Sequence, residues 1–299
     1  MPTSLNNIGW QGAFYNIAKI VATGGLVYLA GILIEKSTSQ GDSLYDANQH
    51  AWMIIMAILS AVMVLLGIYH IFMLPSGGKR AAAEVHRTGK QVMVELGEVL
   101  IDFFRKRHIV YYICFIILYR FAEGFVMKIV PLFLKTEREM GGLGLSEKEI
   151  GLYYGSYGAA AFVLGSLLAG YYISSRGLKK TLFTLCGIFN LPFLVYTLFA
   201  IFQPTNGLLI CSGIIFEYFG YGFGFVGLTL FMMQQIAPGK HQMAHYAFAS
   251  GIMNLGVMIP GMLSGWVCEL FEEWFNKPSG YEPFFIFVLI ATIPAFLIT

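Results

Sequence analysis

Two opposite charges stand three residues apart within a largely apolar stretch, at Arg120 and Glu123 in YRFAEGFVMK (119–128). On a helix, side chains with this spacing lie on one face. They could form an internal salt bridge, in which each charge offsets part of the desolvation of the other. They could also form a charged wall of a water-accessible pathway, on which Glu123 binds and releases a proton. Lys128 lies further along the same predicted helix.

Glu217 is a second carboxylate in an apolar setting, because it is the only charged residue between positions 181 and 239. If this stretch spans a membrane, the charge costs about 2.5–3.5 kcal/mol and must face a partner or water. Glu217 could tie helices together or serve a transport pathway. The same predicted helix carries further polar groups, which are Gln234, Gln235, Tyr218 and Tyr221. Lys19 is a further charge in the first apolar stretch, although its long side chain could reach back to the membrane surface.

Prolines and tyrosines add candidate features elsewhere. Pro192 and Pro260 lie inside apolar stretches, where proline bends a helix and frees a backbone carbonyl, and Asn254 precedes the second of them. Tyr153 and Tyr157 share a face at a spacing of four. They could stack against a sugar ring, or they could simply pack against other helices.

A glycine pattern raises a different possibility. Gly222, Gly224 and Gly227 have the spacing of a dinucleotide-binding fingerprint, which must follow a strand and open a helix. Here the glycines lie in the middle of an apolar stretch without a strand signal, so we predict that they pack helices closely together. Pairs of small residues four apart support this prediction; they are Gly220 with Gly224, Gly151 with Gly155, Ser166 with Gly170, and Gly261 with Gly265.

The sequence gives little support for a metal site or an enzyme. The cysteines are widely spaced within apolar segments; they are Cys114, Cys186, Cys211 and Cys268. His241 and His245 have helical metal-pair spacing but no carboxylate nearby. There is no zinc-binding HExxH motif and no Ser/His or Cys/His pair. We predict no metal, no cofactor, no nucleic-acid partner and no catalytic activity.

The composition predicts an all-α membrane protein that crosses the bilayer several times. Hydrophobic residues make up 57% of the 299 positions and charged residues 12%, where a soluble domain has about 25% charged residues. Uncharged runs of about 18 or more apolar residues indicate membrane-spanning helices. We predict eight, at 11–34, 51–73, 108–134, 148–174, 181–203, 207–236, 243–268 and 281–299.

The distribution of basic residues predicts the orientation. Five lie on one side, at Lys36, Lys135, Arg138, Lys148 and Lys277. Eleven lie on the other, at Lys79, Arg80, Arg87, Lys90, Arg105, Lys106, Arg107, Arg176, Lys179, Lys180 and Lys240. By the positive-inside rule the richer side, and both termini with it, is cytoplasmic.

The segment 74–107 divides the chain unevenly. Its apolar residues from Val85 to Phe103 recur on one helical face, which predicts an amphipathic helix on the cytoplasmic membrane surface. Two predicted spans precede it in 1–73 and six follow it in 108–299. Transporters are often built from matched halves. We therefore expect this 2 + 6 arrangement to lack the first four of twelve helices, or about 120 residues.

Residues 170–180, GYYISSRGLKK, resemble the loop motif of the major facilitator superfamily, G-x-x-x-D-R-x-G-R-R. Gly170, Gly177 and Lys179 match it, whereas Ser174 and Ser175 stand where the family has Asp and Arg. The resemblance implies a gating loop formed by Gly170, Gly177, Lys179 and Lys180.

Longer segments are similar to the AmpG-type muropeptide permeases of that superfamily. In LYRFAEGF (118–125), Arg120 and Glu123 stand where the family has Lys and Asp. Further similar segments follow in the family's order, in IFEYFGYGFG (215–224) and HYAFASGIMNLGVMIPGMLSGW (245–266), and GAFYNIAKIVATGGLVYLAG (12–31) resembles its fifth helix. The resemblance implies that the chain corresponds to helices five to twelve of a permease in the bacterial inner membrane.

The function implied is proton-coupled import of muropeptides for cell-wall recycling by alternating access. Its expected partners are a sugar or peptide fragment of the cell wall, protons, the lipid bilayer and the missing N-terminal helices. The candidate residues for substrate binding or proton coupling are Arg120, Glu123, Glu217, Lys19, Lys128, Asn254, Gln234 and Tyr157. The alternatives are another solute, such as a sugar, a drug or an acyl-CoA-like anion, and a truncated membrane protein that transports nothing.

Overall fold

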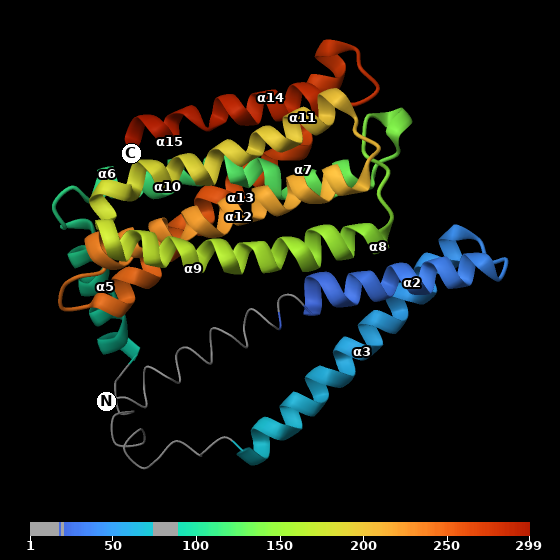
Figure 1. Ribbon diagram of the computed structural model, residues 1–299. Coiled ribbons are helices and arrows are strands. Elements are labelled where there is room, and N and C mark those ends of the chain that lie inside the picture. The colour runs from blue at the N-terminus through green and yellow to red at the C-terminus, as the bar shows by residue number, and fades with distance from the viewer. Residues whose placement is uncertain (1–17, 19–20, 74–88) are drawn as a thin grey trace. The chain divides into compact units, whose positions relative to one another are not determined.

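A computed structural model of the chain describes residue 18, residues 21–73 and residues 89–299. Every regular element among these residues is a helix (Figure 1), which confirms the predicted all-α class. The described residues divide into two compact units, one with residues 30–73 and 89–107 and the other with residues 18, 21–29 and 108–299.

The smaller unit holds α3 (Leu44–Met73), α5 (Gly89–Phe104) and most of α2 (Leu26–Ser39). Ser43 begins α3 as a cap, since its hydroxyl accepts a hydrogen bond from the backbone N–H of Asp46 at 3.2 Å. The amphipathic helix expected from 85 is helical from Gly89, and residues 85–88 lie outside the described residues. Much of the predicted span 11–34 also lies outside them; its described part holds the π-helix η1 (Val21–Gly25) and the start of α2.

The larger unit is a bundle of long, roughly antiparallel helices (Figure 1). In chain order it holds α6 (Ile109–Tyr119), α7 (Phe121–Lys135), η2 (Arg138–Met140), α8 (Glu147–Ile150), η3 (Gly151–Gly158), α9 (Ala159–Arg176), α10 (Leu178–Asn190), η4 (Leu191–Phe193), α11 (Leu194–Phe202), α12 (Gly207–Phe231), η5 (Met232–Ile236), α13 (Gln242–Phe275), α14 (Tyr281–Ala291) and α15 (Ile293–Ile298).

Six helices among the described residues are long and apolar enough to cross a membrane. They are Leu44–Met73, Glu147–Arg176, Leu178–Phe202, Gly207–Ile236, Gln242–Phe275 and Tyr281–Ile298. Five of them lie in the larger unit, in agreement with the predicted spans. Large apolar side chains on their outer faces, such as Leu164 and Leu167, are exposed. A lipid bilayer accounts for this exposure, because lipid tails solvate apolar groups.

The predicted span 108–134 is not one continuous helix. It divides into α6 and α7 at Arg120, whose backbone leaves the helical region with φ −107° and ψ 6°. The span at 181–203 is also interrupted, by the 3₁₀ turn η4 that contains Pro192, as proline predicts. Pro260 does not interrupt its helix in the same way, because α13 is continuous through this residue.

The glycines of α12 are packing residues, as predicted. A Cβ atom on Gly222 would lie 2.1 Å from the carbonyl oxygen of Phe162 on α9, and one on Gly224 would lie 2.3 Å from Cβ of Phe189 on α10. Ser166 Oγ donates a hydrogen bond to the carbonyl of Gly222 at 3.1 Å. These contacts belong to helix crossings, and the glycines do not follow a strand as a dinucleotide site requires. Two predicted packing positions differ, since a Cβ atom added to Gly170 or Gly265 would meet nothing within 4 Å.

Candidate functional site

Arg120 and Glu123 form a buried ion pair where α6 meets α7. The Nε and Nη2 groups of Arg120 donate to Oε2 and Oε1 of Glu123, each at 2.5 Å. The two residues are only 5% and 3% exposed. A guanidinium group that binds both oxygens of one carboxylate is held in a fixed plane. The pair is therefore well ordered, and it presents one positive and one negative charge at the break in the helix.

A face of α12 supports this pair. Glu217, Tyr221 and Phe225 follow one another at a spacing of four, which places them on one side of the helix. The Arg120 guanidinium carbon lies 5.3 Å from the centre of the Phe225 ring, a cation–π contact. Tyr221 lies close enough to both charges of the pair to interact with them electrostatically.

Glu217 is as buried as the ion pair, with 7% of its surface exposed, but its partner is different. The hydroxyl of Tyr196 on α11 donates a hydrogen bond to its Oε2 at 3.0 Å. No described cation forms an ion pair with Glu217, whereas Glu123 lies close enough to act on it electrostatically. The site therefore combines two carboxylates with one arginine.

Aromatic rings enclose the carboxylates. Tyr154 of η3 and Tyr218 of α12 meet edge to face with ring centres 5.0 Å apart. Tyr221 meets Phe162 of α9 at 5.0 Å and Phe189 of α10 at 5.7 Å. Such contacts keep side chains in place and exclude water, which strengthens electrostatic interactions inside the enclosure.

The structure separates the predicted site residues into two groups. Arg120, Glu123 and Glu217 come together in the bundle. The others that it describes have exposed side chains; they are Lys128, Asn254, Gln234 and Tyr157. Lys128 lies beside Gly261 of α13. Lys19 lies outside the described residues.

Sequence reasoning did not place Tyr196 and Phe225 in the site, and it treated Tyr221 only as a polar group on the helix of Glu217. The spacing of Tyr221 and Phe225 from Glu217 could have identified these two, because it puts all three on one helical face. No local signal identifies Tyr196, since 21 residues and the connection between α11 and α12 separate it from Glu217.

The predicted gating loop is shorter than expected. Gly170 lies within α9, Lys179 and Lys180 lie in the first turn of α10, and only Gly177 is non-helical. Its φ of +81° and ψ of 145° suit glycine and strain other residues. Both lysines are exposed. The connection between α9 and α10 is therefore a one-residue turn flanked by basic side chains.

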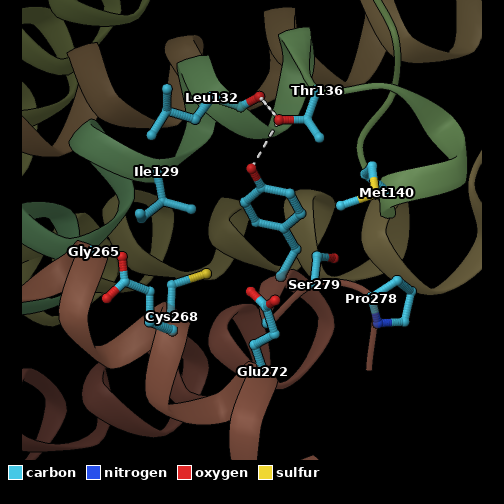
Figure 2. Close-up of a pocket in the computed structure, with 12 residues that line it drawn as sticks. Ile129, Leu132, Thr136, Met140, Gly265, Cys268, Glu272, Pro278 and Ser279 are labelled. Atoms are coloured by element: carbon cyan, nitrogen blue, oxygen red, sulfur yellow. Dashed lines mark hydrogen bonds between the residues drawn. The ribbon is translucent and has the colours of Figure 1, made fainter. Parts of the chain in front are cut away.

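A separate cavity of about 250 Å³ lies where α7, α13 and α14 approach one another at their ends. Figure 2 shows Leu132 and Thr136 on one wall and Cys268 and Glu272 on the other. The hydroxyl groups of Thr136 and Tyr281 are hydrogen-bonded at 2.9 Å. None of the three buried charged residues lines this cavity, so it is not the charged site.

Comparison with known proteins identifies the family. The profile of the Major Facilitator Superfamily matches residues 113–299, more than half of the chain. The chain belongs to the major facilitator superfamily. It is 25% identical over 191 residues to a transporter named AmpG 1 from Rickettsia felis, and this match covers 64% of the chain and 40% of the relative. Transporters of the same name from Rickettsia bellii and Rickettsia conorii are 24% and 25% identical, with 42% of each covered.

These matches confirm the resemblance to AmpG-type transporters that the sequence motifs indicated. The match spans about two-fifths of the length of these relatives. Membership of the superfamily, together with the six long apolar helices, supports a multi-pass membrane protein.

Proposed function

We propose that the protein imports muropeptides, the sugar and peptide fragments of the bacterial cell wall, across the inner membrane in symport with protons. One observation carries the proposal. A buried arginine is held by one carboxylate, which lies near a second carboxylate that pairs with no cation among the described residues. Cell-wall fragments of this class carry carboxylates, and arginine binds a carboxylate through two parallel hydrogen bonds.

The charges supply a reason for coupling to protons. With Glu123 and Glu217 both ionised, they and Arg120 together carry one net negative charge, which is costly in a buried site. Binding of one proton makes the site neutral. An arriving carboxylate that takes Arg120 leaves Glu123 without its partner, so Glu123 must then bind a proton as well. Cargo and protons therefore enter together.

The arrangement of helices supports alternating access. The break at Arg120 and the turn at Gly177 are positions where a helix can change direction without losing a long run of hydrogen bonds. We place both termini and the segment 74–107 in the cytoplasm, following the excess of basic residues. We place the cargo at the charged site of the larger unit.

Uptake of labelled muropeptide by inner-membrane vesicles that contain the full-length protein tests this function. Wild-type protein should concentrate the unmodified compound when a proton gradient is imposed. Glu123→Gln should abolish this accumulation, because Gln cannot exchange a proton. The matched control is Glu273→Gln, which changes an exposed carboxylate of α13. Full accumulation by a variant with both Glu123 and Glu217 changed to Gln would contradict the coupling.

A further inference from the structure

Tyr196 is held in the protein with little freedom to move. It is 1% exposed and lies in the first turn of α11. Its ring stacks on Phe285 of α14, with ring centres 5.8 Å apart and planes 27° apart. The next residue, Thr197, donates a hydrogen bond from Oγ1 to the carbonyl of Phe285 at 3.2 Å. Two contacts with α14 therefore fix where the Tyr196 hydroxyl points.

The break at Pro192 brings this turn against α12. A Cβ atom on Gly220 would lie 2.4 Å from the carbonyl oxygen of Ile188 and 2.5 Å from Cγ of Pro192. Only glycine allows this close approach, and Gly220 lies one turn from Glu217 on the same helix. The proline break, the glycine and the stacked tyrosine thus act together to place a hydroxyl at the carboxylate of Glu217, at 3.0 Å.

Few other ionisable groups of the described residues act on Glu217. From neighbouring elements they are Tyr196 on α11, Tyr154 on η3 and Glu123 on α7, the last paired with Arg120. Tyr218 and Tyr221 are on α12 itself. Of these tyrosines, Tyr196 is the one with a hydrogen bond to the Glu217 carboxylate.

We propose that Tyr196 is the positioning residue of the proton site: it holds the Glu217 carboxylate in one orientation and sets the pH range over which this group exchanges its proton. The inference rests on the proposed function and assigns a regulator to that site. A hydrogen bond donated to the ionised form of a carboxylate stabilises that form. Without the hydroxyl, Glu217 keeps its proton to a higher pH and releases it more slowly to the cytoplasm.

Tyr196→Phe tests the inference, because it keeps the ring on Phe285 and removes only the hydroxyl. We expect the alkaline midpoint of uptake against pH to rise by about one pH unit. The maximal rate should fall, and the KM for cargo should stay within about twofold because Arg120 is untouched. Tyr281→Phe is the matched control, since it removes a tyrosine hydroxyl bonded to Thr136 and remote from Glu217. Its pH profile should match the wild type.

A second pair of variants separates positioning from folding. Phe285→Leu removes the ring beneath Tyr196 but keeps its hydroxyl, so it should shift the profile in the same direction by a smaller amount. In a Glu217→Gln background, in which only the exchange of labelled for unlabelled cargo remains to be measured, Tyr196→Phe should not change the pH profile of that exchange. If neither Tyr196→Phe nor Phe285→Leu shifts the profile while wild type accumulates cargo, the inference is wrong and the function stands. If wild type accumulates nothing, the proposed function itself is wrong.

Discussion

The two buried carboxylates of the bundle, Glu123 on α7 and Glu217 on α12, differ in how their charge is balanced. Both are more than nine-tenths buried. Glu123 is paired with an arginine three residues away, within its own stretch of chain. Among the described residues, Glu217 is instead hydrogen-bonded by the hydroxyl of Tyr196, on the helix that follows the break at Pro192. In the proposed mechanism, Arg120 leaves Glu123 to bind an anionic cargo. In the same mechanism, Glu217 binds and releases a proton.

The largest effect should come from removing one partner of the ion pair between Arg120 and Glu123. Arg120→Ala leaves the Glu123 carboxylate buried without a cation, so we expect a loss of about 3–5 kcal/mol in stability. Thermal unfolding of the purified protein measures it. Arg120→Met combined with Glu123→Leu should recover most of this stability and still bind no anionic cargo. A single substitution as stable as wild type would show that the pair is dispensable for folding.

Glu217→Gln should give the opposite result. Gln has nearly the same shape and no charge to bury, so stability should stay within about 1 kcal/mol of wild type. Accumulation driven by a proton gradient should be lost, whereas exchange of labelled for unlabelled cargo should persist because it needs no net proton movement. Accumulation and exchange are both measured in the same vesicles, and the comparison shows whether Glu217 acts in proton coupling alone. Loss of exchange along with accumulation would make Glu217 part of cargo binding instead.

Gly220→Ala should affect the Glu217 site and spare the ion pair. The added methyl group would meet the carbonyl of Ile188 and the ring of Pro192, and overpacking of this kind costs about 1–3 kcal/mol. The added methyl group should displace the break at Pro192 from α12, which moves Tyr196 away from Glu217. The alkaline midpoint of uptake against pH should therefore rise. Gly251→Ala is the control, because it adds a methyl group in open space. If Gly220→Ala leaves the pH profile unchanged, the break at Pro192 does not control the position of Tyr196 at the proton site.

The contrast between the carboxylates also separates what the sequence can predict from what it cannot. The pairing of Arg120 with Glu123 follows from their spacing, and the glycine crossings of α12 and the break at Pro192 follow from residue type. The end of α6 at Arg120 has no such signal, because neither proline nor glycine stands there. It arises where Arg120 meets α12 and Gly124 meets the carbonyl of Val257.

Polarity alone could not tell which candidate side chains are enclosed. Asn254 and Gln234 are as polar as the residues of the site, but their side chains are exposed in this chain. Membrane helices lack a simple polar outer face, so residue type does not show which face meets another helix. Residue type also does not predict the contact of Tyr196 with Glu217, because this contact depends on the path of the chain between the two residues.

Phe225→Leu should have the smallest effect and acts only on the arginine. It removes the ring beneath the Arg120 guanidinium, and a desolvated contact of this kind contributes about 2 kcal/mol or less. The bidentate pair with Glu123 remains, so stability should fall slightly. The KM for anionic cargo should rise severalfold, because the arginine is less well held when it exchanges partners. The pH profile should stay that of wild type, since Tyr196 and Glu217 are unchanged. A shifted profile with an unchanged KM would mean that the two carboxylates are not functionally separate.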